Sequence, residues 1–153
     1  MTLANLLSAN QIIPDLQSRD RWPAILELVD RLVSSGFVNP LDKDGILRAL
    51  ELREQTMSTG IGFGIAIPHA SSDRVTEVVA AFGRSKEGIE FGSLDNVPVR
   101  FIVMFVVPKD QFQIHLRTLA AIAKFLNDRG VRERLSLAES SEEILRIFQA
   151  PGR

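Results

Sequence analysis

Apolar residues recur along this chain in two patterns, one with helical spacing and one in short continuous runs. Helical spacing predicts a helix over residues 22–35, with Pro23 in its first turn and Gly36 just past its end. Further helices are expected over residues 2–7, 42–55, 111–127, 131–137 and 141–149. Ser140 or Ser141 is the predicted N-cap of the last helix.

Strands are expected between these helices. Continuous or β-branched runs predict them over residues 11–14, 65–67, 75–82 and 99–107. The last run, V-R-F-I-V-M-F-V-V, is almost entirely apolar and stops at Pro108. A strand without alternation is usually buried on both faces, so we expect this one at the centre of a sheet with helices above and below. Alternating helices and strands, with no repeat or linker, predict a single α/β domain over residues 1–153.

Charge and composition narrow the classes of partner. The chain has 18 basic and 19 acidic residues, so no basic excess indicates nucleic acid or an anionic membrane surface. It has no cysteine, which excludes disulfides, thiolate metal sites and cysteine nucleophiles. Its apolar runs are shorter than the roughly 20 residues that span a bilayer, and residues 1–10 lack the features of a secretory signal. We therefore expect a cytoplasmic protein, peripheral to a membrane at most.

The most informative segment, residues 59–69, reads T-G-I-G-F-G-I-A-I-P-H. It ends on His69, one of only two histidines in the chain. Pro68 biases the residue before it towards extended geometry, so the segment is expected to reach His69 as a strand. Ligands of open α/β sheets gather beyond the carboxyl ends of strands, which makes His69 a candidate reactive group. An ordinary surface histidine is the alternative.

Three glycines alternate before this histidine, at Gly60, Gly62 and Gly64. Glycine lets a backbone amide come close to an anion, and it also adopts positive φ without strain. The segment is not a P-loop, because no Gly-Lys-Ser/Thr follows, and its spacing does not fit a dinucleotide fingerprint. A phosphate cradle and a plain turn into a strand are both compatible with it.

Two more residues suit the chemistry of an anion. His115 lies near the start of the predicted helix 111–127, in line with its apolar stripe, so it should point towards the sheet at a helix end that favours negative charge. Arg53, near the end of helix 42–55, has a planar guanidinium that suits phosphoryl oxygens. The alternatives are a histidine at the edge of the core and a solvated arginine at a helix C-terminus.

These groups suit nucleophilic attack on phosphorus by a neutral imidazole, since the free pKa of histidine is about 6.5. His115, Arg53 and backbone amides would then stabilise the phosphoryl group. No acid–base pair for hydrolysis is evident, which is typical of a carrier that must keep its phosphate. A two-histidine metal site, with a carboxylate such as Asp73, is an alternative, but zinc normally takes three or four protein ligands.

These segments closely resemble the signature of the phosphotransferase-system (PTS) enzyme IIA (EIIA) domains of the mannitol/fructose type, type 2, a group that includes the nitrogen-regulatory IIA proteins. The matching stretches are Arg53-Glu54, S-T-G-I-G-F-G-I-A-I-P-H-A at 58–70, F-G-S-L-D-N-V-P-V at 91–99, the apolar strand ending at Pro108, and H-L-R-T-L-A at 115–120. The resemblance covers roughly residues 3 to 149.

The resemblance implies a three-layer α/β/α sandwich around a mixed sheet of about five strands. It implies that His69 is the phospho-acceptor, usually through Nε2, and that His115 and Arg53 are the other active-site residues. Thr59, Gly60, Gly62 and Gly64 become candidates for the phosphate cradle. No metal or organic cofactor is expected.

The resemblance also implies partners and two possible functions. The phosphoryl donor would be a histidine of the carrier HPr or of its nitrogen-branch counterpart. In the regulatory reading, which a free-standing domain favours, the phosphorylation state of His69 controls binding to a transporter, kinase or other target. In the alternative, fructose- or mannitol-type sugar uptake, the phosphate passes to an EIIB domain. Phe63, Phe112 and Ile114 are candidates for an apolar docking surface, with core packing as the alternative for each.

Overall fold

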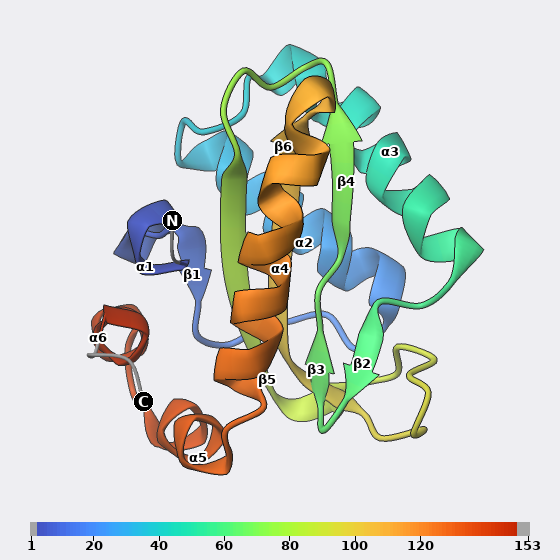
Figure 1. Ribbon diagram of the computed structural model, residues 1–153. Coiled ribbons are helices and arrows are strands. Elements are labelled where there is room, and N and C mark those ends of the chain that lie inside the picture. The colour runs from blue at the N-terminus through green and yellow to red at the C-terminus, as the bar shows by residue number, and fades with distance from the viewer. Residues whose placement is uncertain (1–2, 150–153) are drawn as a thin grey trace.

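A mixed β-sheet runs through the middle of the molecule and carries helices on both faces (Figure 1). The structure is a computed structural model that describes residues 3–149, so residue 2 of the predicted first helix lies outside it. Six strands form the sheet in the order β1-β5-β6-β3-β2, with β4 also pairing with β6. The expected α/β/α sandwich is confirmed, with six strands in place of about five.

Strand β6 (Val99–Pro108) is the centre of the sheet, as its continuous apolar run predicted. It pairs antiparallel with β5 (Val79–Ile89) on one side, and parallel with β3 (Ile65–Ala66) and β4 (His69–Ser72) on the other. The outer strands are β1 (Ile12–Ile13), parallel to β5, and β2 (Gly60–Gly62), antiparallel to β3. Residues 101–108 of β6 are all buried, because helices cover both of its faces.

The helices follow the apolar spacing of the sequence closely. Those in the described part of the chain are α1 (Leu3–Leu6), α2 (Arg21–Ser34), α3 (Lys43–Thr56), α4 (Phe112–Leu126), α5 (Arg129–Leu137) and α6 (Ser141–Gln149). Each lies within a few residues of its prediction. The hydroxyl of Ser140 accepts a hydrogen bond from the backbone N–H of Glu143 at 3.1 Å, so Ser140 caps α6.

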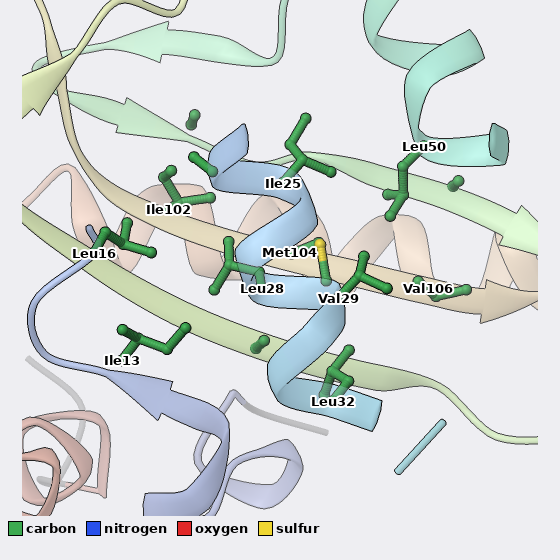
Figure 2. Packing of buried hydrophobic residues seen from close by; sticks show 14 of the residues in the cluster. Ile13, Leu16, Ile25, Leu28, Val29, Leu32, Leu50, Ile102, Met104 and Val106 are labelled. Carbon is green, nitrogen blue, oxygen red and sulfur yellow. The ribbon is translucent and has the colours of Figure 1, made fainter. Parts of the chain in front are cut away.

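Two apolar cores lie on opposite faces of β6. On one face α2 and α3 pack against Ile102, Met104 and Val106, and Figure 2 shows these three residues along β6 where α2 crosses the strand. On the other face α4, α5 and α6 cover Phe101, Val103 and Phe105. The alternation of β6 side chains between the two cores is the period of two that any strand imposes.

The prediction for the strands was incomplete in three places. Strands β2 and β4 were not predicted, because G-I-G and H-A-S-S lack the residues typical of strands and form only by pairing with β3 and β6. The run predicted over 75–82 begins later and ends later, at Val79–Ile89. The pairing of β5 with β6 starts at Val79, opposite Val106. It extends β5 past Gly83 and Arg84, two residues that do not favour a strand by themselves.

Candidate functional site

His69 lies where two strands meet end to end along the central strand. Strand β3 ends at Ala66, and His69 itself opens β4 in register with Phe105 of β6. The sequence had placed His69 beyond a strand end; the structure puts it at the start of the next strand. His69 shares the face of Phe105, which is the face that α4 covers. Its imidazole is partly buried.

The imidazole of His69 is held on two sides. Its Nδ1 atom lies 2.9 Å from the backbone carbonyl oxygen of Ile67. The ring of Phe112, from the first turn of α4, stacks on it with the centroids 6.2 Å apart. Because a carbonyl oxygen only accepts hydrogen bonds, Nδ1 carries the proton and Nε2 of the neutral ring has a free lone pair. The geometry therefore leaves Nε2 as the nucleophilic atom.

Several groups act on the pKa of His69, and the net effect lowers it below its ordinary value. Burial of the ring is the largest cause, because it disfavours the charged form. The hydrogen bond to Ile67 acts in the opposite direction, the positive charge of Arg53 lowers the pKa further, and the negative charge of Glu54 raises it. The imidazole of His69 is therefore mostly neutral at neutral pH.

Arg53 and Glu54 lie side by side on the last turn of α3 and play different parts. Arg53 is partly buried, and its Nη1 donates to the backbone carbonyl of Met57 at 2.8 Å. Its positive charge is one of the causes that lower the pKa of His69. Glu54 is only 2 % exposed and accepts hydrogen bonds from Thr59. Sequence reasoning did not assign Glu54 a role, because burial at a helix end cannot be read from the letters R-E.

His115 is buried on α4, one turn after Phe112, as the apolar stripe of the helix indicated. Its Nδ1 atom is buried and has no hydrogen-bond partner within the described residues. His115 lines a hollow of about 410 Å³ together with Gln111, Phe37, Val78 and Val79. Helix α4 thus carries both His115 and Phe112. Of these two residues, Phe112 is the one whose ring contacts the imidazole of His69.

The three glycines belong to a tight hairpin. Phe63 and Gly64, with φ of 57° and 78°, form the two-residue loop between β2 and β3, and Gly62 has φ of 100°. Two consecutive positive φ values define a type I′ turn, for which glycine is favoured. Gly60 pairs with Ala66, and a side chain at Gly60 would overlap Ser93. Gly62 and Gly64 are needed for the turn, which is at the end of the hairpin away from His69. Thr59 and Gly60 are at the other end and lie closer to His69.

The docking candidates differ in exposure. Phe63 is 63 % exposed and Ile114 is 68 % exposed. Phe112 is partly buried against His69. The Phe63 ring also faces the guanidinium of Arg132 at 5.1 Å. Ile114, two residues after Phe112 on α4, is therefore the exposed apolar side chain nearest in sequence to the residue that covers His69.

Two classes of feature are not found in residues 3–149. No helix there combines the length and the apolar character needed to cross a membrane. Nor do three or more histidine, aspartate and glutamate side chains gather anywhere in this range so that they could hold a metal ion.

Comparison with known proteins gives a consistent result. Residues 5–150 match the family model described as the phosphoenolpyruvate-dependent sugar phosphotransferase system, EIIA 2. A fructose-specific EIIA component of Haloferax volcanii is 42% identical over 121 residues, which are 79% of this chain and 77% of the relative.

Solved structures agree with the family match. The nitrogen regulatory protein IIA-Ntr of Neisseria meningitidis superposes with a TM-score of 0.86 at 28% identity, covering 95% of this chain and 98% of its own. The mannitol enzyme IIA of Escherichia coli, solved in complex with phosphorylated enzyme IIB, gives 0.79 at 25% identity, covering 95% and 98%. The chain belongs to the EIIA type 2 family of the phosphotransferase system.

Proposed function

We propose that this protein is a histidine phosphocarrier that accepts a phosphoryl group on Nε2 of His69 from HPr or its nitrogen-branch counterpart. The observation that carries the proposal is the hydrogen bond between Nδ1 and the carbonyl of Ile67. It leaves Nε2 unprotonated in a ring whose lowered pKa keeps it neutral. In this broad sense the protein is a phosphotransferase that works in the cytoplasm.

The transfer is a displacement at phosphorus. The lone pair of Nε2 attacks the phosphorus atom, the bond from phosphorus to the donor nitrogen breaks, and that electron pair returns to the donor imidazole. The proton on Nδ1 stays in its hydrogen bond to Ile67, so the phosphorylated ring is cationic. We assign Arg53 to the phosphoryl oxygens, since its planar guanidinium suits an oxyanion and its charge acts on the imidazole of His69. His115 is assigned to the same site from the neighbouring helix α4.

Two uses of the phosphoryl group are open to an EIIA protein. In the first, phosphorylation of His69 adds about two negative charges at the site and so changes which transporter or kinase docks there. In the second, the phosphate passes to an EIIB domain, as in sugar uptake. The fructose-specific relative at 42% identity favours the second use, and the superposition on IIA-Ntr favours the first.

A phosphotransfer assay with labelled phospho-HPr tests the proposal. We expect wild-type protein to be labelled and His69→Ala to remain unlabelled while its circular dichroism is unchanged. Phosphorus NMR of the labelled protein should show a phosphoryl group on Nε2. Labelling of His69→Ala at the wild-type level would overturn the assignment. Adding EIIB domains of fructose and mannitol type then separates the two uses, because the regulatory reading predicts no onward transfer.

A further inference from the structure

We propose that Glu54 is a positioning residue for His69: through Thr59, its buried carboxylate holds the stretch of chain whose carbonyl orients the imidazole. This inference rests on the proposed function of His69 as phospho-acceptor. It assigns a role in the reaction to a side chain that need not touch the phosphoryl group.

The carboxylate of Glu54 is buried but fully engaged. One of its oxygens accepts from the backbone N–H of Thr59 at 2.8 Å, and the other accepts from the Thr59 hydroxyl at 2.6 Å. Nη1 of Arg21, on α2, lies 3.7 Å from the first oxygen. A carboxylate that is 2 % exposed is costly unless it is paired and hydrogen-bonded in this way. Removing it would leave the donors of Thr59 without their partner.

Thr59 connects this carboxylate to His69. Thr59 is 4 % exposed, and its carbonyl oxygen accepts from the backbone N–H of Ile67 at 3.0 Å. That bond extends the pairing of β2 with β3 beyond Gly60 and Ala66. The carbonyl of Ile67 then accepts from Nδ1 of His69 at 2.9 Å. A continuous series of polar contacts therefore runs from Arg21 through Glu54 and Thr59 to the imidazole.

This series of contacts reaches the link between β3 and β4, which does not itself belong to either strand. Strand β3 stops at Ala66 and β4 starts at His69, so Ile67 and Pro68 lie between the two stretches that pair with β6. Proline has no N–H to donate, which leaves the Ile67–Thr59 bond to hold this short link on its outer side. Because the Ile67 carbonyl belongs to the link, its direction depends on Thr59. The ring tautomer of His69 depends in turn on that carbonyl.

The charge of Glu54 has a second effect. Glu54 raises the pKa of His69 while its neighbour Arg53 lowers it. During transfer the ring becomes cationic and the phosphoryl oxygens remain anionic. The two adjacent side chains thus match the two charges that form: the carboxylate suits the ring, and the guanidinium suits the oxygens.

The first experiment needs no phosphotransfer. Long-range proton–nitrogen NMR reports the tautomer and the pKa of His69 in the wild type, Glu54→Gln and Thr59→Val, with Glu51→Gln as the matched control one turn earlier on α3. We expect the Nδ1–H tautomer to dominate in the wild type and its share to fall in Glu54→Gln and Thr59→Val. In Glu54→Gln the pKa of His69 should also fall. Glu51→Gln should match the wild type.

The second experiment measures the rate of phosphate acceptance from phospho-HPr in the same variants. We expect a loss of about tenfold in Glu54→Gln and Thr59→Val, and recovery in Thr59→Ser, which keeps the hydroxyl. Wild-type tautomer and rate in both variants would overturn the inference. A slower rate with an unchanged tautomer would overturn it too, since a structural defect alone has that result. If the wild type accepts no phosphate on His69, the proposed function fails, whereas the tautomer measurement still tests Glu54.

Discussion

The ring of Phe112 lies nearly parallel to the imidazole of His69, with the ring planes 19° apart and the centroids 6.2 Å apart. Phe112 is contributed by α4 and His69 by β4, so the contact joins two layers of the sandwich. The phenyl ring stacks on the imidazole, and the proposed nucleophilic atom Nε2 lies on the ring edge. It also contributes to the burial that is the main cause of the lowered pKa of His69.

Removing this cover should change both the pKa and the lifetime of the phosphorylated state. In Phe112→Ala we expect the pKa of His69 to rise towards its ordinary value, because water reaches the imidazole. For the same reason, the phosphorylated protein should lose its phosphate several times faster. NMR titration and decay of the label measure the two effects. Gln113→Ala, on the exposed side of α4, is the control and should leave both unchanged. An unaltered pKa in Phe112→Ala would show that other groups bury the ring.

Acceptance of phosphate should depend on pH through the lowered pKa of His69. A free histidine is half protonated near pH 6.5, whereas His69, with its lowered pKa, is less than half protonated there. The rate should therefore fall to half of its maximum at a pH below 6.5, lower than for a free histidine. The free energy of unfolding should also fall as the pH drops. Between the pKa of His69 in the folded protein and its higher pKa in the unfolded chain, the unfolded chain binds more protons, so acid favours unfolding.

Arg53→Gln should alter this profile in a defined way. Loss of the positive charge raises the pKa of His69, so the fall in rate begins at a higher pH than in the wild type. The rate should also drop by at least about tenfold at every pH, since the phosphoryl oxygens lose a charged donor. Single-turnover rates across the pH range measure both. The exposed Arg48→Gln on the same helix is the control. A profile that coincides with that of the wild type would remove Arg53 from the site.

His115→Ala should separate function from folding. The buried Nδ1 of His115 has no hydrogen-bond partner among residues 3–149, so deleting the ring removes an unsatisfied polar atom as well as packing. We expect the free energy of unfolding to change by no more than about 1 kcal/mol, because these effects oppose each other. Phosphate acceptance should slow by about 10- to 100-fold, with some labelling retained. Urea denaturation measures the free energy of unfolding, and the transfer assay measures the rate of phosphate acceptance. Leu116→Ala, at the exposed neighbouring residue, is the control.

The glycine hairpin can be tested apart from the site. Gly64 has φ of 78°, which alanine adopts at a cost of about 1–2 kcal/mol and asparagine at a lower one. If Gly64 serves only the turn, Gly64→Ala lowers the free energy of unfolding by that amount, Gly64→Asn by less, and labelling of His69 changes less than twofold in both. A large loss of labelling in the folded Asn variant would instead support a place for Gly64 in the phosphate cradle.

A buried arginine outside the site should matter for stability alone. Arg84 is 2 % exposed and donates to the backbone carbonyls of Pro14, Leu135 and Ala138, which ties β5 to the end of α5. Arg84→Met would leave these carbonyls without their donor, and we expect a loss of about 3 kcal/mol in urea denaturation. Arg100→Met, exposed on the neighbouring strand β6, should cost little. Equal stability of the two variants would contradict this role.

Much of this protein was determined by local sequence. The helices, the central strand β6 and the two-layer cover of helices follow from apolar spacing, because amphipathic helices and a wholly apolar strand have few ways to bury their side chains. The candidate residues His69, Arg53 and His115 also came from the sequence, since few residue types suit phosphoryl chemistry and the chain has only two histidines.

Only the tertiary structure decided what surrounds those residues. Strand β4 forms from H-A-S-S because β6 offers it a free edge, and pairing overrides weak local preference. The burial of Glu54, its hold on Thr59 and the stacking of Phe112 on His69 join segments that lie apart in the chain. Hydrogen bonds and ring contacts of this kind depend on how the helices pack against the sheet. The spacing of residues along one segment does not determine this packing between segments.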